Sequence, residues 1–287
     1  GTNISGSGLV HAFKFPIRYL DVRDSQIDND GMDNVAKMTN LRGLILKRCG
    51  NLDDRALAKI TNLPLRYISI DNNVDFSNKA MDSIGKLKEL RQLSIENNTA
   101  IDAIGMAKLK VLPHLESLMI SPEHTDPEYY RKIASLNLKI FCVVGDDYRE
   151  RQRISKDCLK ALGDGFYYMK FSHVVIDEES LQIIKNYKNL AILELFDTQL
   201  DNQMVDSLVN MPIVGLGLVK QDLSDRGLLK VLDMKKLKKL SLTSNRFVTK
   251  KGIEVLKKKR PGLVIIENNV FAFTNSYSPY KDNSDWK

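Results

Sequence analysis

Few side chains in this sequence have types and spacings that could do chemistry. The first candidates are four histidines, which are His11, His114, His124 and His173. They lie far apart in the sequence, and none has a cysteine, aspartate or glutamate at a metal-ligand spacing that recurs elsewhere. His173 has tyrosines and a lysine nearby and could act as a general base, but no nucleophile stands at a recognisable spacing from it. We therefore expect no enzyme activity, no cofactor and no metal site.

The three cysteines, Cys49, Cys142 and Cys158, also lack the spacing of metal ligands. Their number is odd, and Cys49 and Cys158 occupy recurring positions of a sequence pattern described below. We interpret them as structural thiols rather than a redox pair. Free thiols favour a reducing, intracellular compartment, although the sequence leaves open that the protein is a secreted effector.

The elements that must position these side chains recur along the chain. A short motif appears nine times: an apolar residue, then Asp, Ser or Thr, two variable residues, usually a small residue, and another apolar residue. Its copies begin at Ile27, Leu52, Phe76, Ile101, Ile154, Ile176, Leu200, Leu223 and Val248. An alternating run lies upstream of the motif, with apolar first, fourth and sixth residues, as in residues 41–46. The runs begin 23 to 28 residues apart, and such a period predicts stacked repeats.

Each repeat is expected to contain one strand and one short helix. The alternating run predicts a strand whose first, fourth and sixth residues point inward. The Asp, Ser or Thr of the motif is typical of a helix N-cap, where its side-chain oxygen accepts a hydrogen bond from a free amide. One repeat cannot bury its own apolar side, but a stack of repeats shares a continuous core.

This pattern of spaced leucines resembles the leucine-rich repeat superfamily, over residues 17 to about 268. The resemblance implies an α/β solenoid shaped like a horseshoe, with a parallel β-sheet on the concave face and short helices on the convex face. We expect residues 17–269 to form one domain of about 11 repeats. Residues 1–16 are interpreted as an N-terminal extension, a processing or tag remnant and a cap, and residues 270–287 as a C-terminal cap and tail.

Two departures from the family pattern stand out. The ninth residue of each run, counted from its first apolar residue, is normally Asn or Cys, but in five repeats it is Ser25, Glu123, Val174, Thr198 and Gln221. We therefore expect an interrupted ladder of hydrogen bonds at that position. Residues 145–153 lengthen the sixth repeat, and an insertion in a solenoid is either a tolerated surface loop or part of a binding site.

The concave face is the usual ligand face of the superfamily, so it supplies the candidate partner-binding residues. Its side chains are mostly polar in the first repeats and become apolar and aromatic towards the middle. A water-facing sheet has no structural need for such a stripe, which predicts either a partner site or a surface covered by the tail or a neighbouring chain. The predicted contacts are Arg23, Arg48, Asp71, Glu96, Met119, Tyr167, Tyr168, His173 and Phe196.

Composition and charge restrict the class of protein. With 43% hydrophobic and 28% charged residues, the chain is typical of ordered globular proteins, and no apolar run of about 18 residues could span a membrane. The net charge of +7 is uneven, because residues 230–260 alone carry +10. That segment is either a solvated face or a binding site for nucleic acid or anionic lipid.

We interpret the chain as a non-catalytic protein-protein interaction module that binds an unknown protein partner through the concave face. The helical motif looks most like the repeats of F-box ubiquitin-ligase adaptors and of effectors that intracellular bacteria deliver into host cells. A substrate-recognition, adaptor or effector role follows from that resemblance. Nucleic acid or an anionic lipid surface bound by residues 230–260 is the alternative, and no small-molecule substrate is expected.

Overall fold

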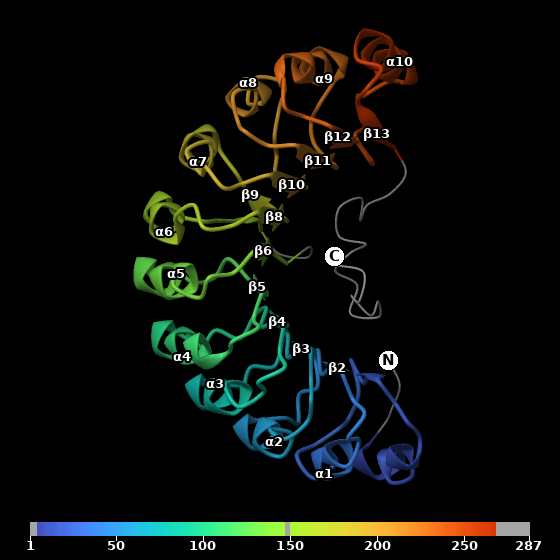
Figure 1. Ribbon diagram of the computed structural model, residues 1–287, viewed down its shortest axis with the longest axis vertical. Coiled ribbons are helices and arrows are strands. Elements are labelled where there is room, and N and C mark those ends of the chain that lie inside the picture. Colours follow the sequence, from blue (N-terminus) through green and yellow to red (C-terminus); the bar gives the residue numbers. More distant parts are fainter. Residues whose placement is uncertain (1–4, 147–149, 268–287) are drawn as a thin grey trace. The chain divides into compact units, whose positions relative to one another are not determined.

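A computed structural model describes residues 5–146 and 150–267. These residues fall into two compact units, which divide between Leu138 and Lys139. Figure 1 shows the same arrangement within each unit, with strands along one side and helices along the other. The predicted tail, residues 270–287, lies outside the described residues, as do residues 147–149 of the insertion. The limits of the predicted domain stay predictions.

The first unit contains five parallel strands at the predicted positions. Each begins two residues after the apolar residue that opens its run. Its strands are β1 (Tyr19–Asp21), β2 (Gly43–Ile45), β3 (Tyr67–Ser69), β4 (Gln92–Ser94) and β5 (Ser117–Ile120). Within one run, Leu41, Leu44 and Leu46 are completely buried, as the alternation predicts. Burial of each such side chain stabilises the fold by about 1.5–3 kcal/mol.

The second unit continues the pattern with six parallel strands in its described residues. These are β6 (Ile140–Val144), β8 (Tyr168–Ser172), β10 (Ile192–Phe196), β11 (Gly215–Val219), β12 (Lys239–Ser241) and β13 (Val264–Ile266). A separate short pair joins β7 (Gln152–Arg153), which belongs to the insertion, to β9 (Val174–Val175). The described part of the insertion is therefore fastened to the next repeat by backbone pairing.

Most of the helices begin where the motif predicts, and they are too short to be stable alone. In the first unit they are α1 (Met32–Ala36), α2 (Asp54–Ala58), α3 (Asn78–Ile84), α4 (Ala103–Lys108) and α5 (Pro127–Ala134). In the second they are α6 (Lys156–Leu162), α7 (Glu178–Ile184), α8 (Val205–Leu208), α9 (Asp225–Lys230) and α10 (Lys250–Lys259). The 3₁₀ helices are η1 (Gly6–Leu9), η2 (Ala12–Lys14), η3 (Leu109–Val111) and η4 (Val231–Asp233). Isolated helices below about 12 residues are marginal in water, so packing on the sheet must hold these.

Most predicted N-caps are confirmed. A side-chain oxygen accepts a backbone N–H of the first helical turn at Asp53, Ser77, Asp102, Asp126, Ser155, Asp177 and Thr249. Asp28 and Asp201 instead cap the turns before α1 and α8, which begin later than the motif predicts. Ser224 makes no cap bond with its side chain.

The residue after the cap links neighbouring repeats. Asp54 accepts hydrogen bonds from the backbone N and Oγ of Ser77 at 2.9 and 2.6 Å. Asp225 does the same to Thr249 at 2.8 and 2.6 Å, and Asn202 accepts from the backbone N of Gly227 at 3.1 Å. This contact explains the small residue of the motif. A Cβ on Gly227 would collide with Asn202 and lie 2.5 Å from Leu223 Cδ1.

A second set of side chains links repeats at the ends of the strands. Asn73 donates to the carbonyls of Leu46 and Ile70 at 2.8 and 2.7 Å, and it accepts from the backbone N of Cys49 at 2.7 Å. These bonds satisfy buried peptide groups, which would otherwise cost about 1–3 kcal/mol each. The sheet is thus held in register by side chains as well as by the backbone.

The predicted interruption of this ladder is wrong at one position and confirmed at another. Gln221 replaces Asn, yet its Nε2 donates to the carbonyls of Leu195 and Val219 at 2.8 and 2.9 Å. Its Oε1 accepts from the backbone N of Leu200 at 2.9 Å. The amide group of Gln is the same as that of Asn, and the longer side chain still reaches the backbone groups of the ladder. At Glu123, by contrast, buried Oε2 has no hydrogen-bond partner among the described residues.

The cysteines are buried thiols, as predicted. Cys49, Cys142 and Cys158 are free and buried. The Sγ of Cys49 donates to the carbonyl of Val22 at 3.2 Å, and burial raises the pKa of this thiol. A thiol with a raised pKa is a poor nucleophile, which fits a structural role.

We predict that Gly227→Ala destabilises the second unit, because the added methyl group displaces Asn202 from the next helix. Overpacking of this kind costs about 1–3 kcal/mol. The urea midpoint of unfolding should fall accordingly. Gly165→Ala is the matched control, since no heavy atom lies within 4 Å of its Cβ position. Equal midpoints for the two variants would contradict the packing explanation.

Candidate functional site

The predicted contact residues divide between the two units. Arg23, Arg48, Asp71, Glu96 and Met119 belong to the first, and Tyr167, Tyr168, His173 and Phe196 to the second. We call the sheet surface that points away from the helices the strand face. All nine lie on the strand face or at the carboxyl ends of its strands.

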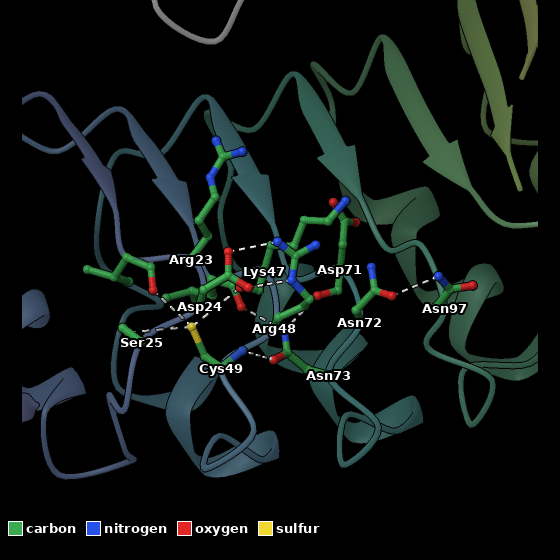
Figure 2. Close-up of polar contacts among 12 residues, drawn as sticks. Arg23, Asp24, Ser25, Lys47, Arg48, Cys49, Asp71, Asn72, Asn73 and Asn97 are labelled. Carbon is green, nitrogen blue, oxygen red and sulfur yellow. Dashed lines mark hydrogen bonds and ion pairs between the residues drawn. The ribbon is translucent and has the colours of Figure 1, made fainter. Parts of the chain in front are cut away.

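In the first unit, the carboxyl ends of the strands carry paired charges (Figure 2). The guanidinium of Arg48 binds the carboxylate of Asp24 in the preceding repeat, with Nη2 and Oδ2 2.7 Å apart. The hydrogen bond from Arg48 lowers the pKa of Asp24. Two repeats further on, Asn97 Nδ2 donates to Asn72 Oδ1 at 2.8 Å. Arg48 is exposed, so this edge can meet solvent or a partner.

Asp71 and Glu96 are not the exposed contacts that the sequence predicts. They are only 5% and 7% exposed. Asp71 accepts hydrogen bonds from Ser69 and Ser94 at 2.7 and 2.6 Å and from the backbone N of Glu96 at 2.8 Å. Lys47 Nζ lies 3.4 Å from Glu96 Oε2. Side chains and backbone groups of neighbouring strands cover both carboxylates. The two carboxylates therefore join repeats.

The residues at these strand ends have left-handed backbone conformations. Positive φ angles occur at Asp24, Arg48, Asn72 and Asn97 in the first unit and at His173, Asp197, Lys220 and Ser244 in the second. The φ angles range from 51 to 61°. A single residue of this kind can indicate functional strain. Here the conformation recurs at the same position of eight repeats, so it belongs to the turn that follows these strands.

In the second unit, three basic side chains converge on one buried carboxylate. Asp197 Oδ1 lies 2.6 Å from Arg151 Nη2, and its Oδ2 lies 2.7 Å from Lys220 Nζ and 3.3 Å from His173 Nδ1. The Asp197 side chain is 8% exposed. Burial tends to raise the pKa of Asp197, but the hydrogen bond from Lys220 and the charge of Arg151 outweigh it and lower the pKa.

An open hollow of about 520 Å³ adjoins this carboxylate. It is lined by Asp146, Glu150, Arg151, Arg153, His173, Val175 and Gln199. Most of these residues come from the insertion or follow β8 and β10. The insertion therefore places charged side chains of both signs beside the strand ends, and Arg151 ties it to Asp197.

The aromatic residues of the second unit differ in accessibility. Tyr167 is 50% exposed, whereas Tyr168 is only 1% exposed and donates from its hydroxyl to Glu194 Oε2 at 2.6 Å. The sequence predicts that Tyr168 is an accessible contact, and this prediction is wrong because the side chain is buried. Phe196 is half-buried, with its ring centroid 4.9 Å from that of His173 in an edge-to-face arrangement.

The apolar stripe is less exposed than the alternation predicts. Ile140, Cys142 and Val219 lie on the strand face but are 4–5% exposed. Met119 in the first unit is half-buried. Alternation fixes the direction of a side chain but not the depth to which its neighbours cover it. The partner-binding role of the nine residues stays a prediction.

Sequence reasoning missed the residues that pair with the predicted ones. Asp24, Arg151, Asp197 and Lys220 were not among the expected contacts. A signal was present, because Asp24 and Arg48 occupy the same position of successive repeats, as do His173, Asp197 and Lys220. Aligning the repeats at the eighth residue of each run would have predicted these pairs.

The basic segment at residues 230–260 is partly structural. Arg260 donates to the carbonyls of Val231, Met234, Lys235 and Leu237 at 2.6–3.3 Å. Lys230 binds Asp206 at 2.5 Å, and Lys257 binds Glu267 at 2.7 Å. Several other lysines of the segment are exposed. Binding of nucleic acid or anionic lipid there stays a prediction.

Within residues 5–146 and 150–267, no group of three His, Cys, Asp or Glu side chains could hold a metal ion. None of the helices described there is long and apolar enough to cross a membrane.

We predict that Asp197→Asn destabilises the protein by about 1 kcal/mol at pH 7, because it removes the buried charge that binds Arg151 and Lys220, and both of these side chains are partly exposed to water. A lowered pKa stabilises the fold above the ordinary aspartate value near 4 and ceases to do so as the pH falls through the folded-state pKa. The gap between wild type and variant should therefore shrink from pH 7 to about pH 3. Thermal melts at several pH values measure it. Asp157→Asn is the control, since that side chain is 77% exposed, and a gap independent of pH would contradict the charge explanation.

Comparisons with known proteins agree with this architecture. Residues 233–257 match a family model described as leucine-rich repeat, and no curated protein sequence matches the chain. A chain in the crystal structure of the Rad7 and Elc1 complex in yeast has 17% identity and a TM-score of 0.51, covering 93% of this chain and 79% of that one. An internalin (InlF) from Listeria monocytogenes str. 4b F2365 has 16% identity and a TM-score of 0.44, covering 98% and 81%. The matched repeat and the recurring strand-and-helix units of the described residues support a leucine-rich repeat fold for this chain.

Proposed function

We propose that the chain is a non-catalytic module that binds a protein partner through the strand face of its second unit. The observation that carries the proposal is the exposed ring of Tyr167. It lies on a strand face that also holds Phe196, His173 and the basic cluster around Asp197. The core of the repeat does not need an exposed aromatic residue at this place.

The chemistry of these side chains suits a protein surface. Aromatic and arginine side chains are enriched at the centres of protein interfaces, where they supply large contact areas and directed hydrogen bonds. Tyr167 and Phe196 offer the apolar contacts. Arg151 and Lys220 offer charge at the rim, held in place by Asp197.

The comparisons support the same class of function without naming a partner. Leucine-rich repeat proteins are typically interaction modules rather than enzymes, and the similar yeast chain was crystallised in a complex of two proteins. We assign no reaction to His173, whose Nδ1 faces Asp197 at 3.3 Å. The adaptor or effector role and the intracellular location inferred from the sequence stay proposals.

We predict that a Tyr167→Ala, Phe196→Ala double variant loses its partner in an affinity capture from cell lysate, read by mass spectrometry. Removal of two interface aromatics should cost more than about 2 kcal/mol of binding. The melting temperature should change by only a few degrees, because neither ring is fully buried.

Phe247→Ala is the matched control, because Phe247 is also 50% exposed but lies after β12. A protein retained by wild type and by this control but lost by the double variant would support the proposal. Equal recovery with all three chains would argue against this face and direct attention to the insertion or the basic segment.

A further inference from the structure

Four arginines form a continuous column across the first unit. Arg18, Arg42, Arg66 and Arg91 each precede their strand at the same position of successive repeats. The backbone N of Arg42 donates to the carbonyl of Arg18 at 2.7 Å, that of Arg66 to Arg42 at 2.7 Å, and that of Arg91 to Arg66 at 2.9 Å. The four residues are therefore direct neighbours in the parallel sheet. We call them the arginine column.

The fold does not require arginine at this position. In the second unit the equivalent residues include Tyr167, Ala191 and Val214, joined by the same backbone hydrogen bonds. Like charges one strand apart repel each other, by about 1 kcal/mol per adjacent pair even in water. An opposite charge placed along the column would reduce this repulsion.

The arginines are accessible to a partner. Arg18, Arg66 and Arg91 are exposed, and Arg42 is half-buried with Nη1 donating to the carbonyl of Leu41 at 3.2 Å. Arg91 also lies 3.5 Å from the exposed Glu116 side chain. An exposed ion pair is weak, typically below about 1 kcal/mol, so a better-placed carboxylate can replace it.

The spacing of the column selects among anionic partners. Adjacent strands lie about 4.8 Å apart, so four arginines span about 14 Å. A helix with one acidic residue per turn presents four carboxylates over about 16 Å. An extended peptide with alternating acids would need about 20 Å. The helix is the closer match, and guanidinium groups bind carboxylates through paired hydrogen bonds.

The other end of the same strands carries paired charges of both signs. Arg23 binds Asp21 and Arg48 binds Asp24, while Asp71 and Glu96 are almost fully buried there. The row of charges of one sign is therefore narrow. It matches a narrow acidic stripe better than a broad anionic surface.

We propose that the arginine column binds a helix of a protein partner that carries acidic residues about once per turn. The proposal deepens the proposed function by stating the chemistry of a partner, and it assigns that chemistry to the first unit. Tyr19 and Tyr67, both half-buried on the strand face, flank the column and provide apolar contact beside the charges.

The test uses the full chain and a fluorescent, alanine-rich helical peptide with four glutamates along one face. A second peptide has the same composition, with the glutamates distributed around the helix. Anisotropy titrations at about 50 mM salt keep charge interactions strong. Wild type should bind the striped peptide more tightly than the scrambled one, and the affinity should fall as salt rises.

An Arg42→Gln, Arg66→Gln double variant should bind the striped peptide about tenfold more weakly, which corresponds to about 1.4 kcal/mol. Arg131→Gln is the matched control, because Arg131 is exposed on α5 in the same unit and should leave binding unchanged. Melting temperatures show whether each variant folds. Arg91→Gln replaces the double variant if that one does not.

Equal binding of the two peptides, or of wild type and the column variant, would overturn the proposal. Tighter arginine-dependent binding of a single-stranded oligonucleotide or of anionic vesicles would also overturn it. The Tyr167→Ala, Phe196→Ala variant separates the two proposals, because it should keep the peptide affinity. If it also keeps every captured partner, the proposed function fails while the arginine column stands.

Discussion

Hydrogen bonds between successive repeats hold this structure together. Each helix is too short to be stable alone, and each strand has only two to five residues. Side chains compensate for this at two levels. Asn73 and Gln221 bind buried backbone groups at the strand ends, and Asp54 and Asp225 bind the cap of the next helix. Because these bonds need one fixed spacing, insertions are tolerated only where they leave it intact, as at residues 145–153.

The same bonds leave the strand face free to vary. Core packing uses the inward residues, and the ladders use the strand ends and the helix caps. The position just before each strand can therefore hold arginine in the first unit and Tyr167 or Val214 in the second without changing the register. A surface that is not needed for folding can be matched to a partner. Both proposals depend on this division between the stabilising and the variable positions.

The site was only partly predictable, because alternation along a strand determines direction and not depth. Arg48 and Tyr167 point outward and are exposed, as expected. Asp71 and Tyr168 also point outward but are covered by partners from neighbouring strands, Ser94 for the first and Glu194 for the second. Whether an outward side chain is accessible depends on the residues 23 to 26 positions away, which one repeat does not contain.

The sequence by itself determined the repeat, the strand positions and most helix caps, because these depend on side chains within about 25 residues of each other. The small residue of the motif was visible too, although its reason was not. Only the tertiary structure showed that Gly227 makes room for Asn202. It alone placed Arg151 against Asp197 and joined the four arginines into one column. These contacts cross from one repeat to another, so they exist only after stacking has set the distance between strands.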